Sequence, residues 1–321
     1  MNLRQTILGV TFENPTVLAS GILGVTASSW RRAVTEGGAG APTTKSVWLK
    51  EHKGHKNPTI ISTEHWTLNA VGVPDAGPGK ARQEITAYRD PPAWQGAKPA
   101  PLIVNIIAET AENFGKTAAD IVAMGPDILE VNISCPNVED EFGKPFACSA
   151  TAAAAVTKAV KAVSGAVPVF IKLSPNALSI AEIAKACAAE GADGFTVINT
   201  VGPGMAIDLK TRLPILTNKV GGMSGPAIKP IAVRCVADVY AATGGKLPII
   251  GTGGVHTGED AIEIMLAGAS LVGIGTAVWK RGISVFKQVC DEMSLFCDAE
   301  GIKDVSELIG GMHRQSSSTP P

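Results

Sequence analysis

A thiol and two amide side chains stand close together in the segment Asn132-Ile133-Ser134-Cys135-Pro136-Asn137. The run that leads into it, 127–132, contains Ile128, Leu129 and Val131 and predicts a buried strand, and the Cys135-Pro136 step directs the chain out of that strand. A thiol can act as a nucleophile or a proton acceptor, and amide groups offer donors and acceptors to a planar, amide-rich ligand. The segment therefore predicts a ligand site at a strand end, with a buried structural cysteine as the alternative.

Two lysines each close an apolar run, Lys45 after residues 41–44 and Lys172 after residues 168–171. A lysine in such a place can simply extend its charge to solvent, or it can form a Schiff base with a carbonyl substrate, as in an aldolase. The third interpretation is that the two cations hold a flavin, whose reduced ring is anionic.

Glycine-rich loops follow two later apolar runs, at Gly253-Gly254 and at Gly275-Thr276. Such loops expose backbone N–H groups at the place where α/β barrels bind phosphate, so they favour a phosphate-bearing cofactor over tight turns alone. A GxGxxG motif does not follow the first strand, and a Rossmann dinucleotide site is not indicated.

These residues need a regular scaffold, and eight short apolar runs predict one. We expect strands at 16–20, 41–48, 101–107, 127–133, 168–173, 194–199, 248–251 and 270–275. Helices are expected between them, with starts at Ser179 and Thr257 and a third helix over 151–163. Alternation of strands and helices without a shift in composition predicts a single (β/α)8 TIM barrel, an α/β fold with its chemistry at the carboxyl ends of the strands.

Two regions do not fit this repeat. Residues 49–94 are rich in Pro, Gly, His and charge, so we expect an elaborated loop with short strands near the barrel mouth, and its His52, His55 and His65 at the surface. One domain is expected over residues 1–312, followed by a disordered tail at 313–321.

Composition excludes several classes of function. The chain has 321 residues, a net charge of −1 and a mean hydropathy of +0.20, without the basic stripe that a nucleic-acid partner requires. Its six cysteines form no CxxC pair, which argues against a metal site, an iron–sulfur cluster or a disulfide framework, and Cys187, Cys235 and Cys290 fit a helical core. Neither a signal-peptide core nor an apolar run of about 18 residues is present, so we expect a cytoplasmic protein without membrane spans.

Several motifs together resemble the class 1 dihydroorotate dehydrogenases, nearest to the NAD-linked subclass 1B. The segments that carry this resemblance are 18–21 (LASG), 44–47 (TKSV), 68–73 (LNAVGV), 131–138 (VNISCPNV), 171–176 (IKLSPN), 198–200 (INT), 208–212 (DLKTR), 221–228 (GGMSGPAI), 251–255 (GTGGV) and 275–277 (GTA). The Asn-x-Ser-Cys-Pro-Asn string followed downstream by Gly-Gly-x-Ser-Gly is the most specific pair.

The resemblance implies a barrel that carries FMN and oxidises dihydroorotate to orotate in pyrimidine biosynthesis. By position, the FMN contacts would be Ser20, Thr44, Lys45, Asn105, Asn132, Lys172, Ile198, Gly225, Gly253, Gly254, Gly275 and Thr276. The substrate contacts would be Lys45, Asn69, Ala70, Val71, Gly72, Val73, Asn132, Asn137, Asn199 and Thr200. Cys135 would be the base that removes a proton from C5, while the hydride at C6 passes to flavin N5.

The resemblance also bears on partners and on alternatives. A 1B enzyme would pair with a subunit that carries FAD and an iron–sulfur cluster, on a homodimeric core, although fumarate use stays open. The segment after the base, 139–144, is acidic where the family has a glycine-rich lid, so its effect on gating is open. A catabolic pyrimidine reductase and a lyase based on Lys172 are the competing functions, and Pro136-Asn137 favours the biosynthetic enzyme over the first.

Overall fold

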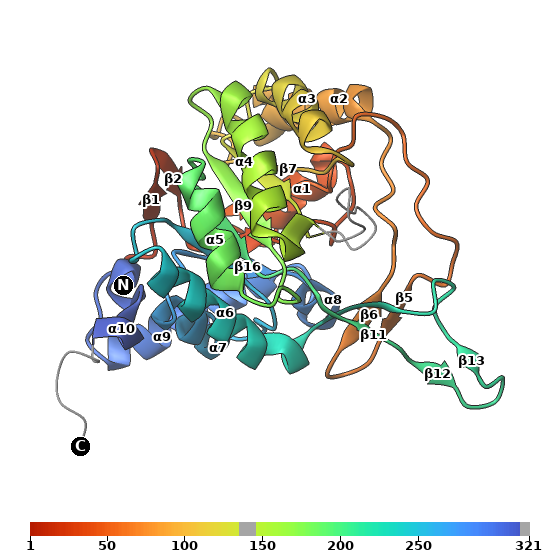
Figure 1. Cartoon of the computed structure of the whole chain (residues 1–321). Coiled ribbons are helices and arrows are strands. Elements are labelled where there is room, and N and C mark those ends of the chain that lie inside the picture. Colours follow the sequence, from red (N-terminus) through yellow and green to blue (C-terminus); the bar gives the residue numbers. More distant parts are fainter. Residues whose placement is uncertain (135–145, 315–321) are drawn as a thin grey trace.

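Eight parallel strands close into a barrel in the computed structural model, which describes residues 1–134 and 146–314 (Figure 1). The barrel strands are β3 (Thr16–Leu18), β4 (Ala41–Pro42), β7 (Ile103–Ile106), β8 (Ile128–Asn132), β9 (Val169–Leu173), β10 (Gly194–Val197), β15 (Ile249–Thr252) and β16 (Leu271–Ile274). They neighbour one another in the order β4-β3-β16-β15-β10-β9-β8-β7, and a parallel bridge between Thr43 and Ile103 joins the two ends. All eight predicted strands and the barrel are confirmed.

The second strand is shorter than predicted. We expected residues 41–48, but the ladder with β3 ends at Pro42. Beyond it, the N–H of Thr43 donates once more to the Leu18 carbonyl of β3, and Thr43 and Val47 form isolated bridges to β7. Proline has no N–H to continue a ladder, which explains the early end.

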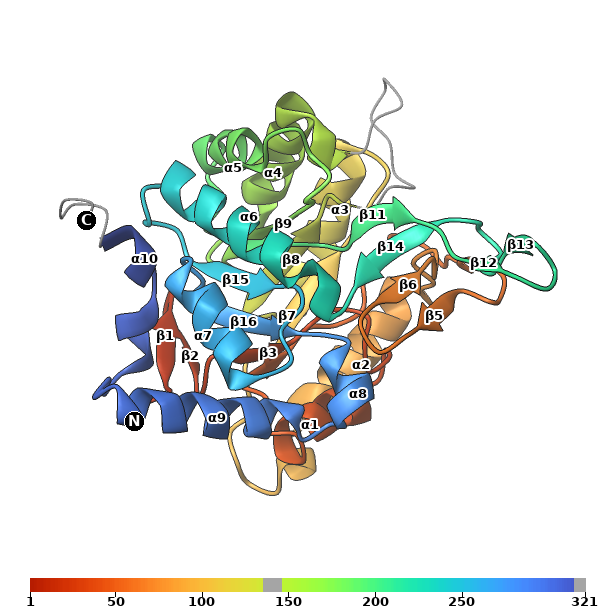
Figure 2. The same ribbon diagram turned by 90° about the horizontal axis from the view of Figure 1, so that it is seen from below.

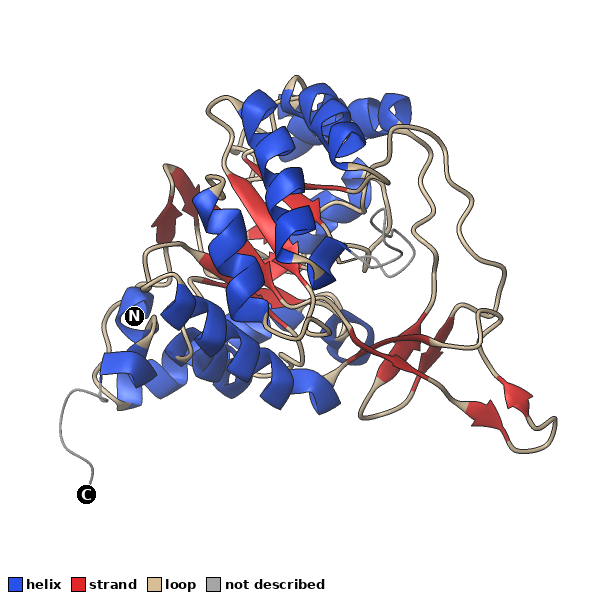
Figure 3. Cartoon of the chain, viewed as in Figure 1, coloured by secondary structure: helices blue, strands red, loops and turns tan. Residues whose placement is uncertain are grey.

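Helices cover the outside of the barrel and follow its strands (Figure 3). They are α1 (Ala27–Thr35), α2 (Pro78–Arg89), α3 (Ala111–Val122), α4 (Ala150–Ser164), α5 (Ile180–Ala189), α6 (Lys229–Ala242), α7 (Gly258–Leu266), α8 (Ala277–Arg281), α9 (Val285–Ala299) and α10 (Gly311–Arg314). Four 3-10 turns accompany them: η1 (Pro91–Trp94), η2 (Phe146–Cys148), η3 (Pro226–Ile228) and η4 (Val305–Leu308).

The helix starts follow the predicted caps. Ser179 caps α5 by accepting a bond from the N–H of Glu182, although the Glu182 carboxylate pairs with Lys185 instead of closing a capping box. Thr257 and Asp260 form a complete capping box at the start of α7. α4 covers the predicted helix and ends before Gly165.

A hairpin closes the amino end of the barrel. It consists of β1 (Gln5–Ile7) and β2 (Val10–Phe12). Ile7 and the fully buried Phe12 pack against residues at or near the starts of barrel strands, namely Val17, Ala41, Ile103, Ile128, Phe170, Ile250 and Leu271. This apolar plug leaves the opposite, carboxyl end for a ligand.

A second, small sheet stands at the carboxyl end. It has the order β11-β14-β6-β5, with β5 (Ile60–Ser62), β6 (Thr67–Asn69), β11 (Val201–Gly204) and β14 (Gly221–Ser224). Figure 2 shows it beside the barrel, with the hairpin of β12 (Ile207–Asp208) and β13 (Leu213–Pro214) projecting beyond. β5 and β6 confirm the short strands expected in residues 49–94.

The same region also contains a helix that we did not expect. α2 and η1 occupy residues 78–94, where the sequence suggested only loop and strands. Pro78 begins α2, and Ile85 and Tyr88, one turn apart, are buried, while Tyr88 packs edge-on against Trp30 and Trp94. Aromatic packing over a long sequence separation therefore stabilises a helix that the local sequence only weakly predicts.

The carboxyl-terminal boundary lies slightly later than expected. His313 and Arg314, which we assigned to the tail, belong to α10. The His313 ring stacks on Tyr240, and its Nε2 lies 3.1 Å from the carbonyl oxygen of Ala267, which holds this turn on the barrel. Within the described residues, no helix is both long and apolar enough to cross a membrane.

Candidate active site

A cavity of about 320 Å³ lies between the carboxyl ends of the barrel strands and the small sheet. A volume of this size suits a small organic ligand. Most of the predicted site residues line it: Ser20, Lys45, Asn69, Ala70, Val71, Gly72, Val73, Asn132, Lys172, Ile198, Asn199, Thr200, Gly225, Gly253, Gly254, Gly275 and Thr276. The structure thus brings together residues that the sequence scatters over 257 positions, from 20 to 276.

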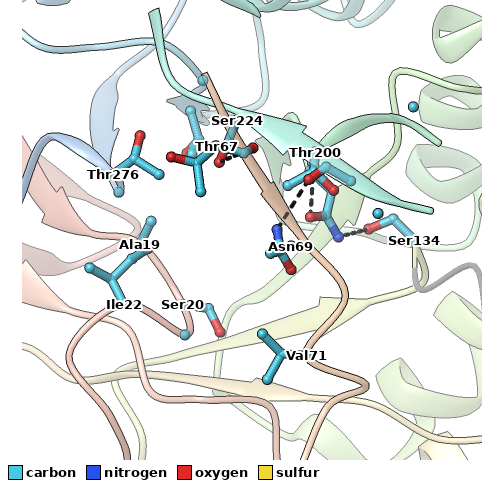
Figure 4. A pocket seen from close by; sticks show the side chains of 18 of the residues that line it. Ala19, Ser20, Ile22, Thr67, Asn69, Val71, Ser134, Thr200, Ser224 and Thr276 are labelled. Atoms are coloured by element: carbon cyan, nitrogen blue, oxygen red, sulfur yellow. Dashed lines mark hydrogen bonds between the residues drawn. The ribbon is translucent and has the colours of Figure 1, made fainter. Parts of the chain in front are cut away.

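One wall of the cavity is a cluster of amide and hydroxyl groups. Asn132 Oδ1 accepts bonds from the Ser134 hydroxyl at 2.8 Å and the Ser134 N–H at 3.2 Å. Asn199 donates to Ser134 Oγ at 2.7 Å, and its own Oδ1 accepts from the N–H of Thr200 at 2.8 Å. These bonds hold the ends of β8 and β10 in one arrangement, with Ser134 and Thr200 on the same side (Figure 4).

A second wall comes from the small sheet. Asn69 ends β6 and donates to the carbonyl oxygen of Gly222 in β14 at 3.3 Å. Figure 4 shows Asn69 and Val71 between the Ser20–Ile22 side and the Thr200–Ser134 side of the cavity. A planar ligand between these walls would meet amide groups on more than one edge.

His55 corrects one expectation. We placed it at the surface with His52 and His65, and those two are indeed exposed, but His55 is half-buried and lines the cavity. Its Nδ1 lies 3.0 Å from the carbonyl oxygen of Ala70, and a Cβ on Gly72 would come within 2.7 Å of its ring. The imidazole therefore supports the loop 70–73, a contact between segments that sequence spacing alone does not reveal.

The two lysines both line the cavity, in different surroundings. Lys172 Nζ lies 3.5 Å from the carboxylate of Glu130, and both side chains are nearly inaccessible to solvent. Lys45 lies near Asp75. Burial raises the pKa of the Asp75 carboxyl above its usual value, and the charge of Lys45 offsets part of this rise. A Schiff-base lysine must present a free amine, so the Glu130 contact of Lys172 favours the cation-site interpretation.

Two predicted cofactor contacts, Thr44 and Asn105, do not line the cavity. Thr44 is buried, and its hydroxyl donates to the Lys45 carbonyl and accepts from the N–H of Asn105, so it links two barrel strands. Asn105 is fully buried, and its Nδ2 donates to Glu130 at 2.6 Å. Its Oδ1 is buried without a hydrogen-bond partner among the described residues, which is costly.

The glycine loops have the geometry that a phosphate site needs. Gly253 and Gly254 have φ angles of +133° and +79°, in the region that favours glycine. A Cβ on Gly254 would lie 2.6 Å from the backbone nitrogen of Lys229, so the loop packs directly against the start of α6. Gly275 has more space, since a Cβ placed on it would lie 3.5 Å from the nearest atom, in the side chain of Ile22. The backbone can therefore approach a phosphate closely at both loops.

An acidic side chain fixes the end of the first glycine loop. Asp260 accepts bonds from the N–H groups of His256 and Thr257, each at 2.9 Å, and pairs with Lys229 at 2.8 Å. Burial alone would raise the pKa of Asp260, but Lys229 and the two N–H groups bring it below its usual value. The loop is thus anchored through an ionised carboxylate.

Sequence reasoning missed several residues. Besides His55, the cavity is lined by Asn176 and Ser224, which lie in segments that carry the family resemblance but were not assigned to the site, and by Trp279, which lies in none of those segments. Glu130 was also missed, although a lone charge inside the apolar run 128–131 was a usable signal. Among the described residues, no group of three or more His, Cys, Asp or Glu side chains is placed to hold a metal ion.

The remaining cysteines are poor candidates for a base. Cys187, Cys235 and Cys290 are buried in helices, as predicted, and burial raises their pKa values to about 11, 11 and 12. The predicted base Cys135, the predicted substrate contact Asn137 and the acidic segment 139–144 lie outside the described residues. Ser134, the last residue described before them, lines the cavity.

Comparison with known proteins gives one consistent family. The dihydroorotate dehydrogenase family model matches residues 2–296. The chain is similar to the catalytic subunit of dihydroorotate dehydrogenase B (NAD(+)) from Methanocaldococcus jannaschii, with 44% identity over 314 residues that cover 97% of this chain and 98% of that protein. The same subunit from Pyrococcus abyssi is 40% identical over 308 residues, covering 96% of this chain and 98% of that protein.

A solved structure agrees in fold. The crystal structure of DHODH from Eimeria tenella in complex with ferulenol has a TM-score of 0.84 to this chain, at 24% identity, and the match covers 98% of this chain and 89% of that one.

Proposed function

The chain belongs to the dihydroorotate dehydrogenase family and is an oxidoreductase, and from this premise we propose that it oxidises dihydroorotate to orotate with FMN, in pyrimidine biosynthesis. The observation that carries the proposal is the single cavity in which two lysines, an amide cluster and two glycine loops meet. The glycine loops suit a phosphate, the lysines suit an anionic ring or carboxylate, and the amide cluster suits a pyrimidine.

The described residues suit FMN. Gly253, Gly254, Gly275 and Thr276 would bind the phosphate through backbone N–H groups and the threonine hydroxyl. Lys172, which lines the cavity, would place a positive charge against the ring. Further contacts would come from Ser20, Lys45, Asn132, Ile198 and Gly225. When bound, FMN supplies the acceptor for the hydride from C6 of the substrate.

The amide groups suit a pyrimidine. Its imide and carbonyl groups present alternating donors and acceptors, which Asn69, Asn132 and Asn199 can match. Such matching gives specificity, because a ligand without these groups would leave buried amides unpaired. We propose that Thr200, Asn137 and the backbone of 70–73 complete the contacts, and that Lys45 offsets the charge of the substrate carboxylate.

We propose Cys135 as the base. The C5–H bond of dihydroorotate breaks, its proton goes to the Cys135 thiolate, and the electron pair forms the new C5–C6 double bond as C6 releases its hydride. Cys135 follows directly after Ser134, which lines the cavity beside Asn132.

Substitution of Cys135 tests this assignment. Cys135→Ala should lower turnover by at least about 100-fold, the usual contribution of a general base, while FMN stays bound. Cys135→Ser should lose less if a weaker base suffices. The matched control is Cys148→Ala, which removes an exposed thiol and should leave turnover unchanged.

The pH profile gives a second test. An ordinary cysteine has a pKa of about 8.5. If Cys135 is the base, wild-type turnover should therefore rise between about pH 7 and 9 as its thiolate forms. Cys187, Cys235 and Cys290 do not contribute to this rise, because burial places their pKa values at about 11 or above. A flat profile from about pH 6 to 9, or a fully active Cys135→Ala variant, would remove the base assignment.

The electron acceptor is a further part of the proposal. The relatives are catalytic subunits of NAD(+)-linked enzymes, so we propose that this chain pairs with a subunit that carries FAD and an iron–sulfur cluster, on a homodimeric core in the cytoplasm. Dihydroorotate oxidation should be measured with NAD and with fumarate, each with and without that subunit. NAD reduction only in the presence of the subunit supports the pairing, and turnover with fumarate alone contradicts it.

A further inference from the structure

A carboxylate is buried inside the barrel, below the cavity, and the reaction as described above gives it no task. Glu130 is 2% exposed and lies in the middle of β8. A buried charge is costly unless it is paired and hydrogen-bonded, and an apolar residue would pack here at less cost. The retention of a carboxylate at this position therefore needs a reason other than packing.

The polar contacts of Glu130 come from three other barrel strands, β7, β9 and β10. Oε1 accepts from Asn105 Nδ2 of β7 at 2.6 Å, and Oε2 accepts from Thr196 Oγ1 of β10 at 2.6 Å. Oε1 also lies 3.5 Å from Lys172 Nζ of β9. Four consecutive strands, β7 to β10, thus direct polar side chains to one point inside the barrel.

Only one member of this group reaches the cavity. Lys172 lines it, whereas Asn105, Glu130 and Thr196 do not. The two neutral side chains occupy both carboxylate oxygens and fix the carboxylate, and the carboxylate in turn faces the ammonium group. The buried polar side chains therefore fix the Glu130 carboxylate, and that carboxylate faces the one charged group of the four that lines the cavity, the Lys172 ammonium.

We propose that Glu130 is a positioning residue, which holds the Lys172 ammonium against the cofactor ring and so stabilises the reduced, anionic form of the cofactor. The inference rests on the proposed binding of FMN in this cavity. Without its carboxylate, Lys172 would be an unpaired buried charge, so the ammonium group would withdraw from the floor or lose its proton. Either event removes positive charge from beneath the ring.

The test is the affinity of the protein for FMN in its two oxidation states. In Glu130→Gln, which keeps the shape but removes the charge, the dissociation constant of reduced FMN should rise about tenfold more than that of oxidised FMN. For a two-electron couple this ratio corresponds to a midpoint potential about 30 mV more negative. An unchanged or more positive potential overturns the proposal.

The control lies directly before the same strand. Asp127 precedes β8 and pairs with Arg89 at 2.6 Å, away from the cavity, so Asp127→Asn breaks a partly exposed ion pair and should leave the potential of bound FMN unchanged. A shift as large as that of Glu130→Gln would show a general effect of ion-pair loss and would contradict a specific role for Glu130.

A double variant separates positioning from a direct charge effect. Lys172→Met should itself make the potential more negative, and Glu130→Gln added to it should give no further shift, because Glu130 acts through Lys172. A positive shift in this background would show that the carboxylate acts on the ring directly, and it would refute the proposal.

A milder variant covers the case in which Glu130→Gln does not fold. Thr196→Val removes one bond to the carboxylate and should shift the potential in the same direction by a smaller amount. No shift would count against the proposal. A wild-type protein that fails to bind FMN would sink the proposed function as well, whereas normal binding without these shifts sinks only the role of Glu130.

Discussion

At the scale of single residues, the cavity is built from side chains that hold one another. Ser134 and Asn199 orient the amide of Asn132, and Glu130 faces Lys172. A ligand therefore meets groups whose positions are already fixed, so less ordering is needed on binding. The same principle predicts that a side chain can affect affinity by holding its neighbours in place, and not only by contacting the ligand.

His55 offers a test at this scale. His55→Ala removes the bond to the Ala70 carbonyl, which is worth about 1 kcal/mol, and should raise KM for dihydroorotate about fivefold with little change in kcat. Steady-state kinetics measures both constants.

The matched control is His65→Ala, a change at an exposed histidine of the same region that does not line the cavity. Its KM should equal that of the wild type. Equal KM values in the wild type, His55→Ala and His65→Ala would show that the His55 contact does not order the loop 70–73.

Most of the site residues that the family resemblance implies line the cavity, but the sequence did not give the direction of each side chain. Lys45 reaches the cavity, while the adjacent Thr44 bonds to the neighbouring strand. His55 acts through a backbone carbonyl 15 positions later in the chain. Such contacts depend on loop geometry, which spacing and composition do not determine.

At the scale of elements, the start of α7 links the stability of the fold to the first glycine loop, Gly253-Gly254. The capping box of Thr257 and Asp260 satisfies N–H groups at the helix start, and Asp260 also binds the backbone of His256, two residues after Gly254. The helix end and the loop are therefore one structural unit.

Loss of the cap should be measurable. Thr257→Ala is expected to lower the free energy of unfolding by about 1 kcal/mol, since the hydroxyl no longer accepts from the Asp260 N–H. Denaturant titration of the protein measures the change. Thr257→Ser keeps the hydroxyl and should unfold like the wild type; an equal loss in both variants would assign the effect to the lost methyl group instead.

Elements differ in how far the sequence predicts them. The barrel strands are buried on both faces, so each is a short apolar run that stands out locally, as in β8 and β9. The small sheet has strands of only three or four residues, and some of them, such as β5, are exposed or half-buried. Their stability comes from pairing over long separations, as between Asn69 and Gly222, so local patterns do not show how they pair.

At the scale of the whole molecule, the two ends of the barrel have separate tasks. The amino end is closed by an apolar plug around Phe12, and the carboxyl end holds the cavity. Changes at one end should therefore affect stability, and changes at the other should affect binding.

Phe12→Ala tests this division. It should lower the free energy of unfolding by about 3–5 kcal/mol, as expected for a fully buried aromatic side chain, while the dissociation constant for FMN stays within about twofold of the wild type. Thermal unfolding and fluorescence titration measure the two quantities. Thr11→Ala, at the exposed neighbouring position, should change neither, and a large loss of FMN affinity in Phe12→Ala would contradict the separation.

The small sheet has a consequence for biosynthesis of the polypeptide. Its strands come from residues 60–69 and 201–224, and the cavity beneath it is completed only by residues up to Trp279. A nascent chain on the ribosome cannot enclose a ligand until the residues up to Trp279 have been translated. Fragments that end before this point should therefore not bind the ligand of this cavity.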